Sequence, residues 1–143
     1  MNDGTAEAEL AGRVSAAMYA KDRAAQMLGI QLRTVRHGYA ELTMTVREDM
    51  LNVHGLCHGG LVFALADTAF GYACHTRNQA NVALQGAISF TAPARLGDEL
   101  IAVAEQRAQG GRTGTYDVTI GLADGTVLAL FRGTNYRVNG TVL

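Results

Sequence analysis

The chain is poor in cysteine, in charge of one sign and in long hydrophobic runs. Its 143 residues include two cysteines, Cys57 and Cys74, which are too few for a disulfide framework. Twelve basic and thirteen acidic residues nearly cancel, so net charge gives no support for binding to nucleic acid or an anionic membrane. The longest apolar stretch, Leu61 to Ala66, is far too short to span a bilayer.

Targeting and linker signals are absent as well. The chain opens acidic and polar, without a basic start followed by an apolar run, and it contains no linker, low-complexity tract or repeat. Apolar residues make up 48% of it, which is typical of a globular protein. We therefore expect residues 1–143 to form a single domain in a reducing, soluble compartment, the cytoplasm.

The hydrophobic pattern predicts an α+β fold. Apolar residues at helical spacing predict a helix over residues 7–27, and a second helix is expected from His58 to His75. Apolar and polar residues alternate in six expected strands, near 30–35, 40–46, 82–90, 100–105, 116–120 and 127–138. The first two would pair across His37-Gly38, and Gly110-Gly111 and Asp124-Gly125 are turn signals between the last three. This order favours a largely antiparallel sheet wrapped over one helix.

Asp67 is the carboxylate best placed for chemistry. The helix around it is apolar nearly all round, which predicts burial on most faces. A carboxylate in such surroundings is costly unless it is paired, protonated or functional. Asp67 is therefore either a satisfied core aspartate or a reacting group.

The start of the same helix, His58-Gly59-Gly60, predicts a donor for a developing negative charge. Free N–H groups and the positive end of the helix dipole suit the oxygen that becomes charged during acyl transfer. The alternative is a glycine-rich turn that needs positive φ. About 12 Å of helix axis separates Gly59 from Asp67, so both act on one carbonyl only if a second subunit supplies one of them. An active site here would lie between subunits.

Other reactive groups match familiar chemistries poorly. The histidines, cysteines and Asp67 contain no three residues at a usual zinc-ligand spacing. No serine lies in a Gly-x-Ser-x-Gly motif. Cys57 next to His58 is more typical of a packed thiol than of a nucleophile–base pair. His37 and His75 are expected at the surface or at a helix end.

The segment Asn52-x-His-Gly-x-x-His-Gly-Gly60, followed by Phe63-x-Leu-Ala-Asp-x-Ala-Phe70, resembles the PaaI (phenylacetic acid degradation protein) family of hot-dog-fold acyl-CoA thioesterases. Asp22 to Gly29, Ser89-Phe90 and Gly111-Arg-Thr-Gly114 support the resemblance. It implies a hot-dog fold and a homodimer that usually pairs into a tetramer. It also implies hydrolysis of acyl-CoA, often an aryl-acetyl-CoA, with no metal or bound cofactor.

The resemblance also implies residue roles. Asp67 would be the nucleophile or general base, and the Gly59 N–H of the opposite subunit would polarise the thioester carbonyl. His58 and Asn52 would orient the acyl end. Where a related branch of the fold has a threonine one turn after the acid, this chain has Gly71, and Thr68 is the candidate replacement. The candidate substrate contacts are Gly60, Thr68, Arg95, Arg112 and Thr113. For the two arginines, proposed to meet CoA phosphates, ordinary solvated charge is the alternative.

Two other functions fit the same residues. A hot-dog acyl-CoA hydratase or dehydratase would use Asp67 and His58 as its acid and base. A non-enzymatic acyl-CoA-binding module would bind ligand without turnover. Release of free thiol from a saturated acyl-CoA distinguishes hydrolysis from both, and the acyl group itself is not predicted.

Overall fold

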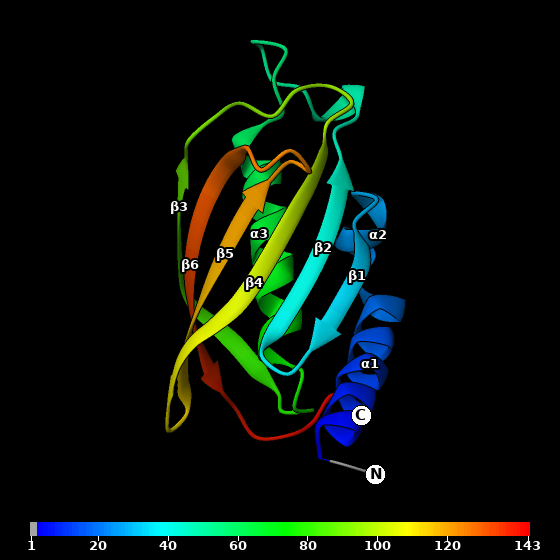
Figure 1. The fold of residues 1–143 in the computed structure, drawn as a ribbon, viewed down its shortest axis with the longest axis vertical. Helices are drawn as coiled ribbons and strands as arrows, with labels where there is room; N and C mark the ends of the chain where they lie inside the picture. The colour runs from blue at the N-terminus through cyan, green and yellow to red at the C-terminus, as the bar shows by residue number, and fades with distance from the viewer. Residues whose placement is uncertain (1–2) are drawn as a thin grey trace.

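The computed structural model describes residues 3–143 as one antiparallel sheet around a long helix (Figure 1). The helices are α1 (Asp3–Lys21), α2 (Arg23–Met27), a 3-10 turn η1 (Glu48–Met50) and α3 (Gly59–Cys74). The strands are β1 (Gln31–Arg36), β2 (Tyr39–Thr45), β3 (Asn81–Phe90), β4 (Glu99–Gly110), β5 (Thr113–Gly121) and β6 (Val127–Arg137). They follow the order β1-β2-β4-β5-β6-β3, and all neighbours are antiparallel. The expected α+β class, with a sheet wrapped over one helix, is confirmed.

The core lies between α3 and the inner face of the sheet. Alternate residues of the strands point inward, so their apolar members are buried against the helix. Phe70 of α3 packs against Tyr116 and Phe131, with ring centroids 5.6 and 5.9 Å away. Burying one large apolar side chain contributes about 1.5–3 kcal/mol. This packing fixes how α3 is rotated beneath the sheet. The buried α3 side chains are Val62, Leu65, Ala66, Ala69, Phe70, Tyr72 and Ala73.

Histidines cap both ends of α3. At the start, His58 Nδ1 accepts a hydrogen bond from the Gly60 N–H at 3.1 Å. At the end, His75 Nδ1 lies 2.7 Å from the Gly71 carbonyl oxygen, and its Nε2 accepts from the Asn81 N–H at 3.2 Å. The helix predicted from His58 to His75 is therefore confirmed, with both histidines as caps. His75 lies at a helix end, as expected.

The single helix expected at 7–27 is wrong, because the chain forms two helices that meet at Asp22. The Asp22 carboxylate accepts a hydrogen bond from the Ala25 N–H and another from the Tyr72 hydroxyl, both at 3.1 Å. A side chain that caps a new helix start ends the preceding helix. The predicted strand boundaries are also too short: β4 and β5 extend to a turn at Gly111, whose φ is +59°.

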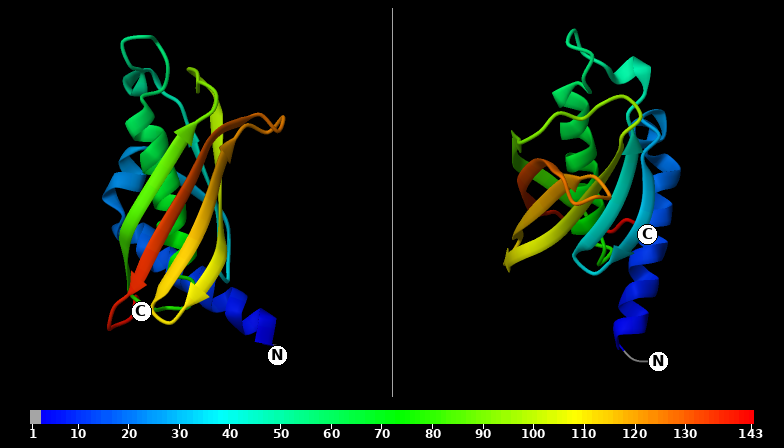
Figure 2. Two further views of the ribbon diagram at one scale, coloured as in Figure 1. Left: turned by 90° about the vertical axis from the view of Figure 1, so that its left-hand side faces the viewer. Right: turned by 45° about the horizontal axis from the view of Figure 1, so that its top comes forward.

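Strand β3 forms one edge of the sheet and is poorly covered. Every residue of it is exposed or half-buried, and Leu84 has an exposed fraction of 59%. The view of this edge in Figure 2 (left) shows β3 beside α3, with no further strand outside it. An uncovered apolar edge strand offers its backbone groups to another chain.

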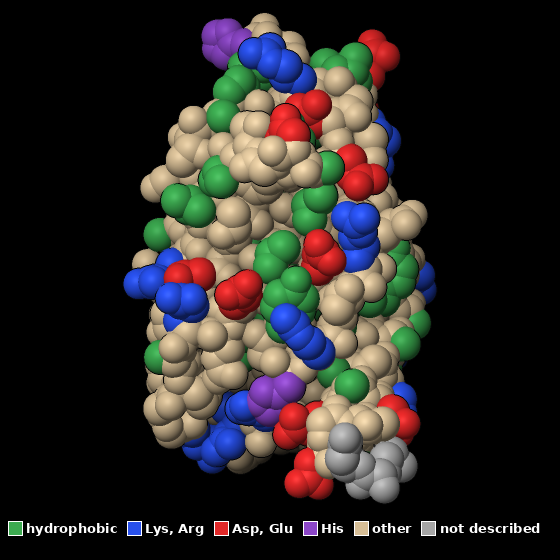
Figure 3. Space-filling view, viewed as in Figure 1, with side chains coloured by type: hydrophobic (Ala, Val, Ile, Leu, Met, Phe, Trp, Pro, Cys, Tyr) green, Lys and Arg blue, Asp and Glu red, His purple; other side chains and the backbone are tan. Residues whose placement is uncertain are grey.

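The outer face of the sheet carries charges of both signs. Figure 3 shows basic and acidic side chains interspersed over it, without a continuous patch of one sign. Within residues 3–143, no helix has the length and apolar character needed to cross a bilayer.

Candidate active site

Asp67 lies in the middle of α3 on the face turned away from the core. The sequence predicts a helix buried on most faces, but Asp67 is exposed in the single chain, because the sheet covers only one side of α3. Its carboxylate makes no hydrogen bond or ion pair with any residue from 3 to 143. The alternative of a satisfied core aspartate is therefore wrong for this chain. Partial burial by its surroundings still raises the pKa of Asp67.

The first residue of α3 supplies a free donor. The Gly60 N–H is taken by the His58 ring, whereas the Gly59 N–H has no acceptor among the described residues. As the first N–H of a helix, it points away from the helix body and carries part of the dipole's positive end. Gly59 thus presents a free N–H at the start of α3, while Gly60 contributes none.

The capping bond also fixes the His58 ring. Since Nδ1 accepts from the backbone, the neutral ring carries its proton on Nε2. The His58 side chain is exposed and its Nε2 has no partner within residues 3–143. This nitrogen faces outward with its donor available.

Asn52 organises the loop that precedes α3. Its side-chain oxygen accepts from the His54 N–H at 2.9 Å and from the Leu56 N–H at 3.2 Å, while its own N–H donates to the Leu56 carbonyl at 2.7 Å. The amide NH₂ has no partner in the described chain, and Asn52 is one of the residues that line a cavity beside Gly59. The Asn52 side-chain oxygen therefore holds the loop, while its NH₂ group remains a free donor.

The remaining predicted residues do not gather at one place in the single chain. Arg95 is next to the loop, in a bridge with Leu56, and its guanidinium has no partner among residues 3–143. Arg112 and Thr113 lie at the opposite end of the sheet (Figure 1). Arg112 donates to the Arg137 carbonyl at 3.0 Å. The Thr68 hydroxyl donates to the Ala64 carbonyl at 2.7 Å, so its proton is already used.

A cavity beside Gly59 was not predicted from the sequence. It holds about 190 Å³ and lies between the loop, the first turn of α3 and the segment after β3. Phe90 closes one side of it. From the sequence, Ser89-Phe90 supports the family resemblance, but no role is predicted for either residue. Only the folded chain brings these distant segments together. The lining residues are Asn52, Leu56, Cys57, Gly59, Val62, Phe90, Ala92, Pro93, Ala94 and Leu128.

The two thiols are unsuited to nucleophilic attack. Cys57 is buried, which confirms a packed thiol, and burial raises its pKa. Burial likewise raises the pKa of Cys74 to about 12. A thiol reacts as its thiolate, so neither group competes with Asp67. Within residues 3–143, no three His, Cys, Asp or Glu side chains come together as a metal site.

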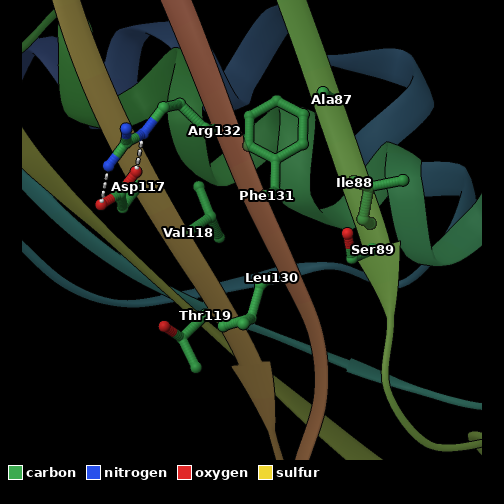
Figure 4. A pocket seen from close by; sticks show the side chains of 9 residues that line it. All are labelled: Ala87, Ile88, Ser89, Asp117, Val118, Thr119, Leu130, Phe131 and Arg132. Carbon is green, nitrogen blue, oxygen red and sulfur yellow. Dashed lines mark hydrogen bonds and ion pairs between the residues drawn. The ribbon is translucent and has the colours of Figure 1, made fainter.

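A larger hollow on the outer face of the sheet has different chemistry (Figure 4). Its carboxylate, Asp117, accepts from Arg132 at 2.6 and 2.9 Å and also pairs with Arg107. The hydrogen bond from Arg132 lowers the pKa of Asp117. The ion pairs stabilise Asp117 as a charged group with a structural use. Asp67 and Gly59 therefore remain the candidate site.

A six-stranded antiparallel sheet wrapped around one long helix is the arrangement of the hot-dog fold. A family model, the thioesterase superfamily, matches residues 54–129. Acyl-coenzyme A thioesterase PaaI of Escherichia coli K12 is 47% identical over 126 residues, covering 88% of this chain and 90% of the relative. The chain belongs to the thioesterase superfamily and, within it, to the PaaI family of hot-dog-fold thioesterases.

Solved structures agree with this assignment. The E. coli PaaI protein from the phenylacetic acid degradation operon superposes with a TM-score of 0.92 at 45% identity, over 94% of this chain and 97% of that one. A hypothetical thioesterase from Streptococcus pneumoniae, solved with coenzyme A, superposes with a TM-score of 0.75 at 27% identity, over 78% and 90% of the two chains.

Proposed function

We propose that the protein hydrolyses an acyl-CoA to a free acid and CoA at a site shared by two subunits of a homodimer. The observation that carries this proposal is the pair of unused groups on α3, the Asp67 carboxylate and the Gly59 N–H. They are eight residues apart, about 12 Å along the helix axis, so they do not meet on one carbonyl within one chain. A partner subunit therefore completes each site.

In the proposed reaction, the Gly59 N–H of one subunit binds the thioester carbonyl. Asp67 of the other subunit either takes a proton from the attacking water or attacks the carbonyl carbon itself. Negative charge then develops on the carbonyl oxygen, where the N–H and the helix dipole stabilise it. Collapse of this intermediate breaks the C–S bond and releases CoA. In the nucleophilic route, water then hydrolyses the acyl-aspartate.

Edge strand β3 supports the dimer. It is uncovered, carries exposed apolar residues and lies beside α3 (Figure 2, left), so pairing of two β3 edges would bring the α3 helices of two subunits near one interface. Exposed Leu130 and Tyr136 on β6 support a second contact between dimers, which would give the tetramer. The unpaired thiols Cys57 and Cys74 fit a reducing compartment, the cytoplasm.

Arg95 is the better supported of the two arginines proposed to bind CoA phosphates. Its guanidinium is unpaired beside the loop, whereas Arg112 already holds the Arg137 carbonyl. We expect Arg95→Ala to raise KM for acyl-CoA several-fold, but not for an acyl thioester lacking the nucleotide. Equal changes for both substrates in steady-state assays would remove Arg95 from the site, and Arg112→Ala is the parallel variant.

The experiment that tests the function is a panel of saturated aliphatic and aryl acyl-CoA esters with free thiol as the readout. Hydrolysis releases CoA, a hydratase leaves the thioester intact, and a binding module gives no turnover. Binding of CoA esters without thiol release from any member would reject the proposal. The CoA-bound S. pneumoniae structure supports the choice of substrate class.

A further inference from the structure

The cavity beside Gly59 has walls that are joined to one another. The Cys57 N–H donates to the Ala94 carbonyl at 2.8 Å, and Leu56 bridges to Arg95, so the loop before α3 is tied to the segment after β3. The bonds to the Asn52 oxygen hold the loop from within. Figure 2 (right) brings this end of the molecule forward. The cavity is therefore formed before any ligand arrives.

Its size and lining restrict what it can hold. At about 190 Å³ it is smaller than the roughly 300–1,000 Å³ of pockets that enclose a whole drug-sized ligand. Its side chains are apolar except for the Asn52 amide and the buried Cys57 thiol. Such a cavity suits a compact apolar group and excludes a nucleotide.

Phe90 lines this cavity together with Gly59, the residue that carries the free donor. It is the last residue of β3 and faces inward, opposite Ala129. Its ring lies against Gly59 so closely that a Cβ on Gly59 would be 3.1 Å from the ring's Cζ. Phe90 is 55% exposed in the single chain, so the core of its own chain does not fix the ring. An aromatic side chain left open beside a donor and a small cavity is available to contact a ligand.

We propose that this cavity receives the acyl group of the thioester and that Phe90 is the residue that sets its size and shape. With the carbonyl at the Gly59 N–H, the acyl group enters the cavity along the Phe90 ring. Short aliphatic and single-ring acyl groups fit, whereas long straight chains meet the joined walls. This inference rests on the proposed thioesterase function and adds its specificity.

The test compares kcat/KM across the acyl-CoA panel for Phe90→Ala and for Ala92→Leu, which fills the cavity. Phe90→Ala should lower the value for single-ring acyl groups about three- to tenfold, change acetyl-CoA little and improve longer chains. Ala92→Leu should abolish activity on ring-containing substrates and retain acetyl-CoA hydrolysis. Leu96→Ala is the matched control, because Leu96 is 57% exposed in the same segment and does not line the cavity.

A second pair of variants covers the case in which Ala92→Leu does not fold. Ala92→Val adds less bulk to the same wall of the cavity than Ala92→Leu does. It should weaken bulky substrates selectively, and adding Phe90→Ala should restore them. If every variant changes all acyl groups by one factor, the cavity is not the acyl site. Absence of wild-type thiol release would instead reject the thioesterase function itself.

Discussion

At the residue scale, two aspartates show how surroundings decide the use of a carboxylate. Asp117 is held by Arg132, whose hydrogen bond lowers its pKa and stabilises its charge. Asp67 has no partner among residues 3–143, and partial burial raises its pKa. A charge that the fold disfavours and leaves unpaired marks a functional group more strongly than a paired one.

Asp67→Asn should lower kcat by at least about two orders of magnitude, because the amide neither attacks nor accepts a proton. The carboxylate stabilises nothing within the chain, so the variant should unfold at the same temperature as the wild type or higher. The matched control is Asp117→Asn, which should keep kcat and lose up to about 1 kcal/mol of stability with its ion pair. Near-normal thiol release by Asp67→Asn would refute the assigned role.

The pH dependence follows from the raised pKa of Asp67. The active form is deprotonated, so kcat/KM should fall as the pH drops through a pKa higher than that of a free aspartate. The folded state also holds this proton to a higher pH than the unfolded chain does. Asp67 therefore lowers the free energy of unfolding by an increasing amount as the pH rises through the window between its unfolded-state and folded-state pKa values. Rates measured across the acid range, with circular dichroism to show that the fold persists, check this; a flat profile would contradict it.

At the element scale, local signals predict α3 and the hairpins well. The apolar run, the histidine ends and Gly59 set the helix within one residue, since caps and periodicity are properties of neighbours in the sequence. The helix break at Asp22 has a local cause, the cap on the Ala25 N–H, but the bond from Tyr72, fifty residues away, is not visible locally. The cavity walled by Phe90 needs the pairing of β3 with β6, a contact between distant strands. The exposed face of α3 likewise depends on which side the sheet covers.

The structural and functional uses of Asn52, at the start of the loop before α3, can be tested separately. Asn52→Asp keeps an oxygen for the His54 and Leu56 N–H groups but loses the free NH₂ donor. It should therefore keep the wild-type melting temperature and lose kcat/KM, if the NH₂ orients the acyl end. Asn52→Ala should lose both, with about 1 kcal/mol of stability. Full activity in Asn52→Asp would show that the side chain only holds the loop.

At the scale of the whole molecule, the single chain contains half of each proposed site. Asp67 is exposed, Gly59 is half-buried at the start of α3, and the edge strand β3 is uncovered. The sequence predicts this separation through helix length, but it contains no signal for which surfaces pair. Complementation between subunits is the direct test.

Asp67→Ala keeps the Gly59 donor, and Gly59→Pro removes that N–H while keeping Asp67. Proline is tolerated at the first helical position, which Gly59 occupies. Gly59→Ala is the matched control, since it adds a Cβ against Phe90 and keeps the N–H; it should retain acetyl-CoA hydrolysis. Each of the first two homodimers should be inactive, because every site in it lacks one group.

Mixing the two inactive variants should restore activity. In a mixed dimer, one site takes Gly59 from the Asp67→Ala chain and Asp67 from the Gly59→Pro chain, while the other site lacks both groups. With free exchange about half of the dimers are mixed, each with one working site of two, so about a quarter of wild-type thiol release should return. Sedimentation and exchange of labelled subunits establish that both variants dimerise and reassort. If they do and no activity returns, Gly59 and Asp67 do not act together across the interface.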